Sequence, residues 1–251
     1  EDGWICPCKK EERAKYDTWA IQLICKTLKV YYDCSGDERI PQVIYKVLKN
    51  YYELLKSGEI KLFQWAKYRW FESFISLNFI YEKYGEDWIC DLAKIIKEQG
   101  FYYNRTTENW KKPSHVWKLN THIVNMAMML KSEAVSHDLL GEDYTDNAEK
   151  LREILDRYNG TAFESFTGDE VLSGLDPTKG TECCAVVEQM YSYEEIFAHT
   201  GDNKWAERLE MLCFNALPAT LSEDMWTHQY VQQVNQIACQ KTMIMAPWST
   251  N

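Results

Sequence analysis

Apolar residues recur at intervals of three and four along much of the chain, which is the spacing of one face of an α-helix. The first such set precedes a short polar turn, 35-SGDE-38, and the second follows it. The members are Ile21, Ile24, Leu28 and Tyr31 before the turn, and Ile40, Val43, Val47 and Tyr51 after it. No segment shows a competing alternation of apolar β-branched and polar residues. The pattern therefore predicts two helices joined by a tight connection.

A turn of the same kind occurs at four places: 35-SGDE-38, 84-YGED-87, 140-LGED-143 and 200-TGDN-203. In each, the glycine can adopt the left-handed conformation that ends a helix, and the acidic residue after it favours the N-terminus of the next helix. The turns predict a series of helical hairpins, over about residues 14–58, 65–100, 118–159 and 181–223.

A series of hairpins without strands predicts an all-α fold. The turn glycines are farther apart and less evenly spaced than in tetratricopeptide or ankyrin repeats, and their spacing suits the inner and outer helical rings of a toroid. We expect residues 1–251 to form a single domain. This domain would be part of an (α/α)6 toroid, incomplete at both ends.

Charge and composition narrow the choice of partners. The chain has 38 acidic and 28 basic residues and a formal net charge of −10, which disfavours binding to the phosphate backbone of nucleic acids. No apolar run reaches the roughly 18 residues of a membrane-spanning helix, and the N-terminal segment lacks the apolar core of a signal peptide. We expect a soluble protein without nucleic-acid or membrane partners.

The chain has nine cysteines, an odd number, and Cys25, Cys90 and Cys213 fall within apolar helical patterns. A free thiol in such a position behaves as a small apolar side chain. We expect these three residues to be reduced and largely buried, which favours a cytoplasmic location.

The segment 160–182 is long for a connection between packed helices and is rich in Gly, Thr and Asp. Long connections often carry function. Glu170 lies within it, and Glu182 ends it, two positions before Cys184. A glutamate and a cysteine at a helix start can bind zinc together, but a zinc site needs three or four ligands, and both residue types are common there for structural reasons. No later CxxC or HxxxH supplies partners, and Cys239 stands alone.

Several other residues have a functional and a structural interpretation. A carboxylate such as Glu170 in a glycine-rich loop is usually solvated, although desolvation would suit it to general acid catalysis. A lone histidine such as His122, at the start of an apolar helix, is more often a core or capping residue than a catalytic one. The run 65-WAKYRWF-71, with Trp65 and Arg69, could stack on a sugar or pack a helix interface.

Longer segments of the chain resemble the β-L-arabinofuranosidase-like proteins of glycoside hydrolase family 127. The resemblance extends over nearly the whole chain and is carried by 35-SGDERI-40, 65-WAKYRW-70, 91-DLAKIIKEQG-100, 122-HIVNMAMMLK-131, 168-GDEVLSGLDPTKGTECCAVVEQM-190 and 211-MLCFNALPATLSEDMWTHQYVQQVNQ-236. It implies an (α/α)6 toroid and a retaining glycosidase whose nucleophile is a zinc-bound cysteine in place of the second carboxylate.

The resemblance also implies roles for individual residues. Glu182 and Cys184 match an E-x-C motif that binds zinc together with an adjacent cysteine pair further along the chain, one of which is the nucleophile. Glu170 matches the glutamate that protonates the departing glycosidic oxygen and then activates water.

The implied partner is a carbohydrate substrate. His122 matches a histidine that lines the sugar-binding subsite. Trp65, Arg69 and His228 are further expected substrate-binding residues, in keeping with the 10 tryptophans and 16 tyrosines of the chain.

One part of the family pattern is absent, because the chain ends at 245-MAPWSTN-251 without the adjacent cysteine pair. We therefore expect an internal part of a larger hydrolase, which alone would be inactive and would bind zinc weakly or not at all. Two other functions remain open: carbohydrate binding without hydrolysis, and a helical-repeat scaffold for a partner. The hydrolase interpretation requires Glu170, Glu182, Cys184 and His122 to converge in one cavity.

Overall fold

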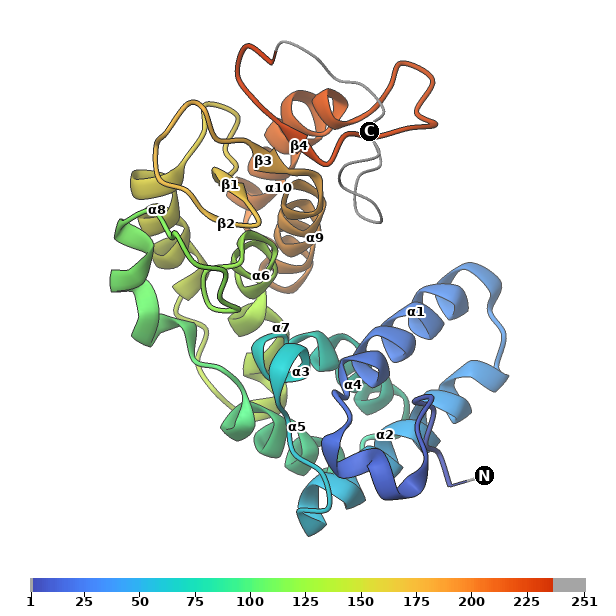
Figure 1. Cartoon of the computed structure of the whole chain (residues 1–251). Helices are drawn as coiled ribbons and strands as arrows, with labels where there is room; N and C mark the ends of the chain where they lie inside the picture. Colours follow the sequence, from blue (N-terminus) through green and yellow to red (C-terminus); the bar gives the residue numbers. More distant parts are fainter. Residues whose placement is uncertain (1, 237–251) are drawn as a thin grey trace. The chain divides into compact units, whose positions relative to one another are not determined.

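Helices dominate residues 2–236, the part of the chain that the computed structural model describes (Figure 1). The α-helices are α1 (Trp19–Ser35), α2 (Arg39–Ser57), α3 (Gln64–Tyr68), α4 (Glu72–Tyr84), α5 (Asp87–Gln99), α6 (Ile123–Met129), α7 (Ser132–Leu140), α8 (Asn147–Asn159), α9 (Cys183–Thr200) and α10 (Asn203–Met211). Shorter helical turns are η1 (Lys10–Lys15), η2 (Tyr103–Lys111), η3 (Leu212–Ala216) and η4 (Pro218–Thr220). The predicted all-α class is confirmed.

The turn glycines lie where the sequence places them. Gly36, Gly85, Gly141 and Gly201 all have φ between 63° and 68°, the left-handed region that glycine occupies without a steric penalty. After the last of them, the Asp202 carboxylate accepts a hydrogen bond from the Lys204 backbone N–H at 3.1 Å and caps α10. The left-handed glycine therefore ends a helix at each of the four turns, whereas a capping carboxylate at the N-cap of the next helix is found at α10 and not at α5 or α8.

The predicted apolar faces of the first hairpin are only partly correct. Ile21, Val47 and Tyr51 are buried, whereas Ile24 and Val43 are 41% and 44% exposed. On α1 the buried positions also include Gln22 and Cys25, so the buried face is rotated relative to the predicted one. Apolar residues occupy more than one side of these helices, and their spacing alone does not define the centre of the buried face.

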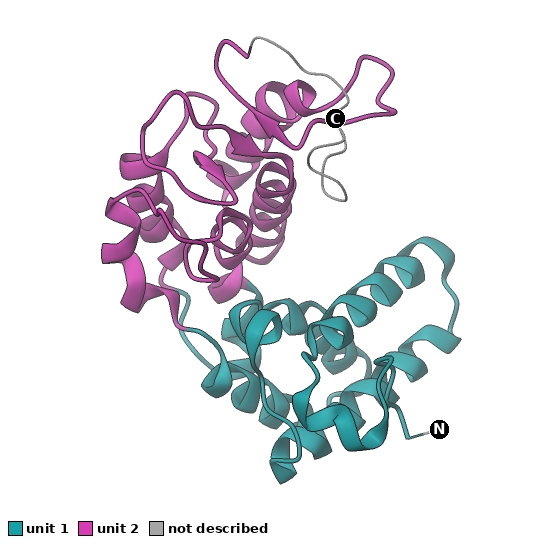
Figure 2. Cartoon of the chain, viewed as in Figure 1, with its two compact units in different colours: residues 1–101, 135–144 teal, residues 102–134, 145–251 magenta. Residues whose placement is uncertain are grey.

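The chain forms two compact units (Figure 2): unit 1 comprises residues 1–101 and 135–144, and unit 2 comprises 102–134 and 145–251. In unit 1, α1 packs against α2 and α4, and α5 packs against the same two helices. The core of this unit is aromatic and aliphatic, and it includes Tyr51, Phe71, Phe74, Leu77, Ile80, Ile89 and Ile96. Burial of such side chains contributes about 1.5–3 kcal/mol each to stability.

In unit 2, α6 packs against α9, α9 packs against α10, and α8 packs against η2. The largest fully buried side chains here include Trp110, Phe166, Tyr193 and Trp205. The Tyr193 ring contacts the Trp205 ring at a centroid distance of 5.2 Å, which ties α9 to α10. This unit holds the segment 160–182 that precedes α9.

A small sheet, which the sequence did not predict, forms in unit 2. Three of its strands belong to the segment 160–182, and the fourth follows α10 in the chain. Its strands are β1 (Gly168–Asp169), β2 (Val171–Leu172), β3 (Thr181–Glu182) and β4 (Val231–Gln232), in the order β2-β1-β3-β4. β1 pairs with β2 antiparallel and with β3 parallel, and β3 pairs with β4 antiparallel. Strands of two residues are too short to show an alternating pattern.

The cysteine prediction is correct for oxidation state and only partly correct for burial. All eight cysteines in the described part of the chain are free thiols. Cys25 is buried, whereas Cys90 and Cys213 are partly exposed. Cys90 lies on the amphipathic α5, outside its buried positions, and Cys213 lies in the π-helical turn η3, which does not follow the α-helical spacing used for the prediction. The cytoplasmic location stays a prediction.

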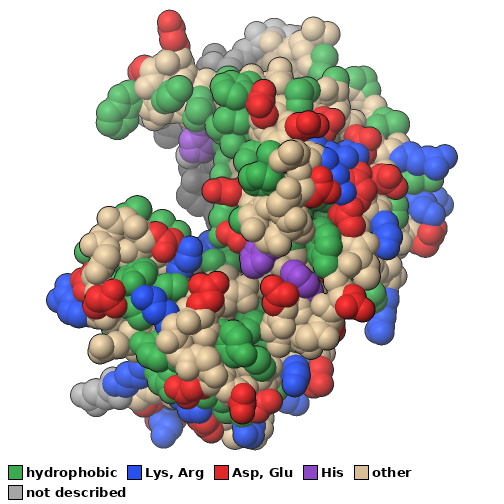
Figure 3. Space-filling model, turned by 180° about the vertical axis from the view of Figure 1, so that it is seen from behind, with side chains coloured by type: hydrophobic (Ala, Val, Ile, Leu, Met, Phe, Trp, Pro, Cys, Tyr) green, Lys and Arg blue, Asp and Glu red, His purple; other side chains and the backbone are tan. Residues whose placement is uncertain are grey.

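Acidic and basic side chains are interspersed on the face shown in Figure 3. No helix within residues 2–236 is long and apolar enough to cross a membrane.

In unit 2, Glu149 on α8 accepts hydrogen bonds from Arg208 on α10 at 2.9 Å and from Arg152 at 3.3 Å. Desolvation raises the pKa of Glu149, but the two guanidinium groups outweigh it, and the net effect is a pKa below the usual value.

Replacing this carboxylate (E149Q) is expected to lower the free energy of unfolding at pH 6 by about 1–2 kcal/mol, because a charge-assisted pair is lost. A lowered folded-state pKa stabilises the protein above the unfolded-state pKa and loses that contribution as pH falls through the folded-state value. The difference between wild type and E149Q should therefore shrink below about pH 4.5. Urea unfolding from pH 6 to pH 4 measures it, with E207Q, at an exposed site of α10, as the control.

Candidate active site

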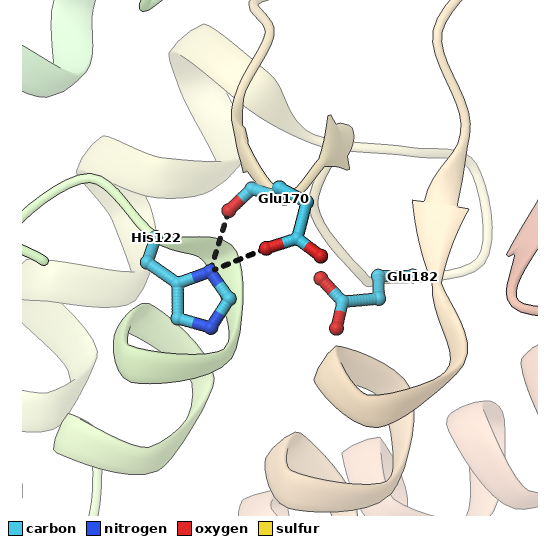
Figure 4. Close-up of side chains that lie close together, drawn as sticks. All are labelled: His122, Glu170 and Glu182. Carbon is cyan, nitrogen blue, oxygen red and sulfur yellow. Dashed lines mark hydrogen bonds and ion pairs between the residues drawn. The ribbon is translucent and has the colours of Figure 1, made fainter. Parts of the chain in front are cut away.

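Three of the predicted site residues converge in unit 2 (Figure 4). His122, Glu170 and Glu182 each offer one ligand atom, and these atoms all lie within 4.8 Å of one another. His122 precedes α6, Glu170 joins β1 to β2, and Glu182 ends β3. In Figure 4 the Glu170 carboxylate lies between the imidazole and the Glu182 carboxylate. The convergence expected of these three residues is therefore observed.

Glu170 is held in an unusual backbone conformation. Its φ is 78°, in the left-handed region that non-glycine residues rarely adopt, at a cost of about 1–3 kcal/mol. Its carbonyl oxygen accepts hydrogen bonds from the Ile123 N–H at 3.0 Å and from His122 Nδ1 at 2.7 Å. Since a carbonyl only accepts, Nδ1 of His122 carries the hydrogen. These bonds fix both the turn and the imidazole ring.

The Glu170 carboxylate has two aromatic hydrogen-bond donors. Trp117 Nε1 donates to Oε2 at 3.2 Å, and the Tyr230 hydroxyl donates to Oε1. Burial raises the pKa of Tyr230 well above its usual value, and the Glu170 and Glu182 carboxylates raise it further, so Tyr230 stays protonated and donates. His122 Nδ1 also lies 3.6 Å from Oε2. The carboxylate is thus oriented from several sides.

Glu182 is positioned by the sheet and by the start of α9. It is 2% exposed and is the N-cap residue of α9 in an extended conformation. Its neighbour Cys183 donates its backbone N–H to the Tyr230 carbonyl at 2.8 Å, next to the pairing of β3 with β4. The same pairing brings Tyr230 to Glu170. Sequence reasoning assigned Tyr230 no role, because only the long-range pairing of these strands reveals it.

Cys184 is not part of this group within residues 2–236. The residue is exposed overall. Partial desolvation of its thiol and the nearby Glu182 carboxylate nevertheless raise the pKa of Cys184 to about 12. It is therefore a neutral thiol at pH 7, and binding a metal would displace its proton. Its role as a zinc ligand stays a prediction.

The remaining predicted site residues are divided between the two units. Trp65 and Arg69 belong to unit 1, where the Arg69 guanidinium lies over the rings of Trp65 at 4.3 Å and of Trp19 at 4.9 Å. His228 is exposed and forms an antiparallel bridge with Leu221 in unit 2. Substrate contact by these residues stays a prediction. Cys239 lies outside the described residues.

Residues 3–250 match the family model described as β-L-arabinofuranosidase, GH127 catalytic domain. The chain belongs to this family. The match confirms the resemblance carried by its sequence segments. A comparison with curated proteins gives no match.

Solved structures of the family share the fold of this GH127 chain. A GH127 β-arabinofuranosidase aligns with a TM-score of 0.57 and 15% identity, over 86% of this chain and 35% of the other. A GH127 β-L-arabinofuranosidase from Geobacillus stearothermophilus aligns with a TM-score of 0.59 and 15% identity, over 92% of this chain and 42% of the other. The chain therefore spans less than half the length of these two proteins.

The fold extends beyond the family. An unsaturated glucuronyl hydrolase specific for heparin aligns with a TM-score of 0.59 and 13% identity, over 85% of this chain and 60% of the other. At such low identity the likeness concerns the fold alone. Together the alignments confirm that the helical hairpins of the GH127 chain have the fold of toroid-type glycoside hydrolases.

Proposed function

We propose that this chain carries the acid/base residue of a retaining glycoside hydrolase that cleaves β-L-arabinofuranosides. Family membership supports the reaction class. The observation that carries the mechanism is the convergence of Glu170 with Glu182 and His122, whose ligand atoms all lie within 4.8 Å of one another. An acid/base at Glu170 would therefore act beside a metal held at Glu182.

In this mechanism Glu170 acts twice. As an acid it gives its proton to the glycosidic oxygen while a cysteine nucleophile bonds to the anomeric carbon and the bond from that carbon to the oxygen breaks. As a base it then takes a proton from the water that displaces the cysteine from the anomeric carbon and releases the sugar. Trp117 and Tyr230 hold the carboxylate in place through both steps. His122, whose Nδ1 lies 3.6 Å from this carboxylate, would contact the sugar.

Zinc fits the donor chemistry of this site. Two carboxylates this close repel each other, and a bound cation relieves the repulsion. Zinc accepts carboxylate, imidazole and thiolate ligands, and Glu182 with Cys184 would hold it. When bound, zinc keeps a thiolate ligand deprotonated at neutral pH. No adjacent cysteine pair follows Cys184 in residues 185–251, so the assigned nucleophile is not among them.

An assay with an aryl β-L-arabinofuranoside, with and without zinc, tests the proposed function. We expect no turnover by the 251-residue chain alone, and zinc-dependent turnover by the longest polypeptide of its reading frame. Calorimetry with L-arabinose and related sugars measures sugar binding by the same two polypeptides. Sugar binding without turnover by either polypeptide would favour carbohydrate binding without hydrolysis. Robust turnover by the short chain would show that the nucleophile is misassigned.

The hydroxyl of Tyr230 is expected to contribute to catalysis by orienting Glu170. Y230F removes the hydrogen bond to Oε1 without changing the ring. We expect kcat/KM to fall about tenfold, the scale of one lost charge-assisted hydrogen bond. Y102F, at a tyrosine that is 53% exposed, is the matched control and should leave kcat/KM unchanged. Equal rates for Y230F and wild type would remove Tyr230 from the mechanism.

A further inference from the structure

A second cleft in unit 2 lies beside the candidate active site. Its volume is about 590 Å³, and it is lined by the end of η2 and by the loop that leads to His122. Asn109, Ser114, Asn120 and Thr121 supply polar groups to its wall. A cleft of this size has room for a sugar unit, and these side chains offer it hydrogen-bonding groups beside the apolar Pro113 and Val116.

The cleft is basic, although the chain as a whole is acidic. Lys111, Lys112, Lys118 and His115 line it, and Glu108 is its one acidic side chain. Glu108 forms an ion pair with Lys111. Lys112 and Lys118 are exposed and form no ion pair with any of residues 2–236. In a chain of net charge −10, two unpaired lysines facing one cleft favour a ligand with a localised negative charge.

The loop that forms the cleft wall also forms the wall of the active site. Trp117, which donates to the Glu170 carboxylate, stands between Val116 and Lys118, which line the cleft. The loop is pinned to β2, because the Ser114 N–H donates to the Leu172 carbonyl at 2.8 Å and the Leu172 N–H donates to the Thr121 carbonyl at 3.0 Å. Trp117 is thus next in the chain to two residues that line the cleft, and the same loop contributes to both sites.

We propose that this cleft binds an anionic substituent, a carboxylate or a sulfate, on a sugar next to the one cleaved at Glu170. The inference rests on the proposed glycosidase function for the connection between the two sites. Lys112 and Lys118 bind the anion, while the asparagine and hydroxyl side chains of the wall bind ring hydroxyls. Two lysines suit a single charged group, whereas a long polyanion requires an extended basic surface.

Binding of small sugars tests the proposal without requiring catalysis. The chain is titrated with D-glucuronate, with glucose 6-sulfate and with D-glucose, followed by calorimetry and by amide NMR shifts of residues 108–121. We expect one or both anions to bind with a Kd of about 1 mM and the neutral sugar to bind much more weakly. Raising the salt concentration should weaken the anion binding. Equal binding of the anions and glucose would overturn the proposal.

Matched charge variants locate the binding. K112Q/K118Q should weaken anion binding about tenfold, since each exposed ion pair contributes modestly. K46Q/K94Q removes the same charge from exposed positions of unit 1 and should leave it unchanged. Melting temperatures check that both variants fold. Unchanged anion binding in K112Q/K118Q, or an equal loss in K46Q/K94Q, would overturn the proposal.

The Glu170 variant separates failure of this proposal from failure of the proposed function. E170Q should retain anion binding in the cleft, because Glu170 is not among the residues that line it. Hydrolysis of an arabinofuranoside without anion binding would refute the cleft alone. Anion binding by the chain, together with no hydrolysis by the longest polypeptide of its reading frame, would refute the glycosidase and leave the cleft as an anion site. Loss of anion binding in E170Q would show that the ligand occupies the active site.

Discussion

E170Q is expected to lower kcat by about 10²- to 10⁴-fold, the usual contribution of general acid–base catalysis. The amide has nearly the shape of the carboxylate, but it neither donates a catalytic proton nor accepts one from water. The loss should be smaller for an aryl glycoside with a good leaving group than for an alkyl glycoside, because the better leaving group departs without protonation. Steady-state rates on both substrates, with the longest polypeptide of the reading frame, measure this difference.

Chemical rescue distinguishes the base role from loss of structure. Azide is a nucleophile that needs no general base, so it should accelerate E170Q and produce a glycosyl azide with the configuration of the substrate. E207Q, at an exposed position of α10, should retain wild-type rates and show no azide effect. If E170Q keeps more than about half of wild-type kcat on the alkyl glycoside, Glu170 is not the acid/base.

Zinc binding should depend on both Glu182 and Cys184. E182Q and C184S are each expected to weaken zinc binding by at least about 100-fold, because each removes a direct ligand and loss of a supporting contact alone costs about 10- to 100-fold. The effect should be clearest in the longest polypeptide of the reading frame, since the 251-residue chain is expected to bind zinc weakly. Chelator competition with metal analysis measures the affinity.

The ligand type can be tested directly with cobalt in place of zinc. A cobalt–thiolate absorption band should appear in wild type and weaken in C184S, whereas C90S, at a partly exposed thiol of unit 1, should leave it intact. An unchanged affinity and spectrum in C184S would refute Cys184 as the thiolate ligand. Absence of the thiolate band from wild type would instead indicate oxygen and nitrogen donors, such as those of Glu170, Glu182 and His122.

The helical hairpins α1–α2, α4–α5 and α9–α10 could be predicted from the sequence because their causes are local. The hairpin expected over residues 118–159 is not formed as predicted, since most of α7 belongs to unit 1 and α8 to unit 2. A glycine with positive φ and a capping acid occupy adjacent positions, as at Gly201 and Asp202. The exact buried face was harder to predict, since burial of Ile21 but not Ile24 depends on which helices pack against α1. The two-residue strands left no periodic signal at all.

The site residues could be predicted only in part, and the reason is again physical. Glu170, Glu182 and His122 came from matched sequence segments, and no spacing rule brings residues so far apart in sequence together. Tyr230 approaches Glu170 only through the pairing of β4 with β3. The relation of Cys184 to the group depends on how α9 begins, which the E-x-C spacing does not determine.

The small sheet has a consequence for the order in which the protein folds. Its strands β3 and β4 are joined by α9, α10 and the segment after them, so their pairing closes a long loop, whereas each helical hairpin closes a short one. The helices should therefore form early, and the contacts around Glu170 and Glu182 should form last. During partial unfolding the order is reversed, so the contacts around Glu170 and Glu182 should be lost before the helices. Mild destabilisation would separate Tyr230 from Glu170 while most of the helical structure persisted, so catalytic competence would be lost before the fold.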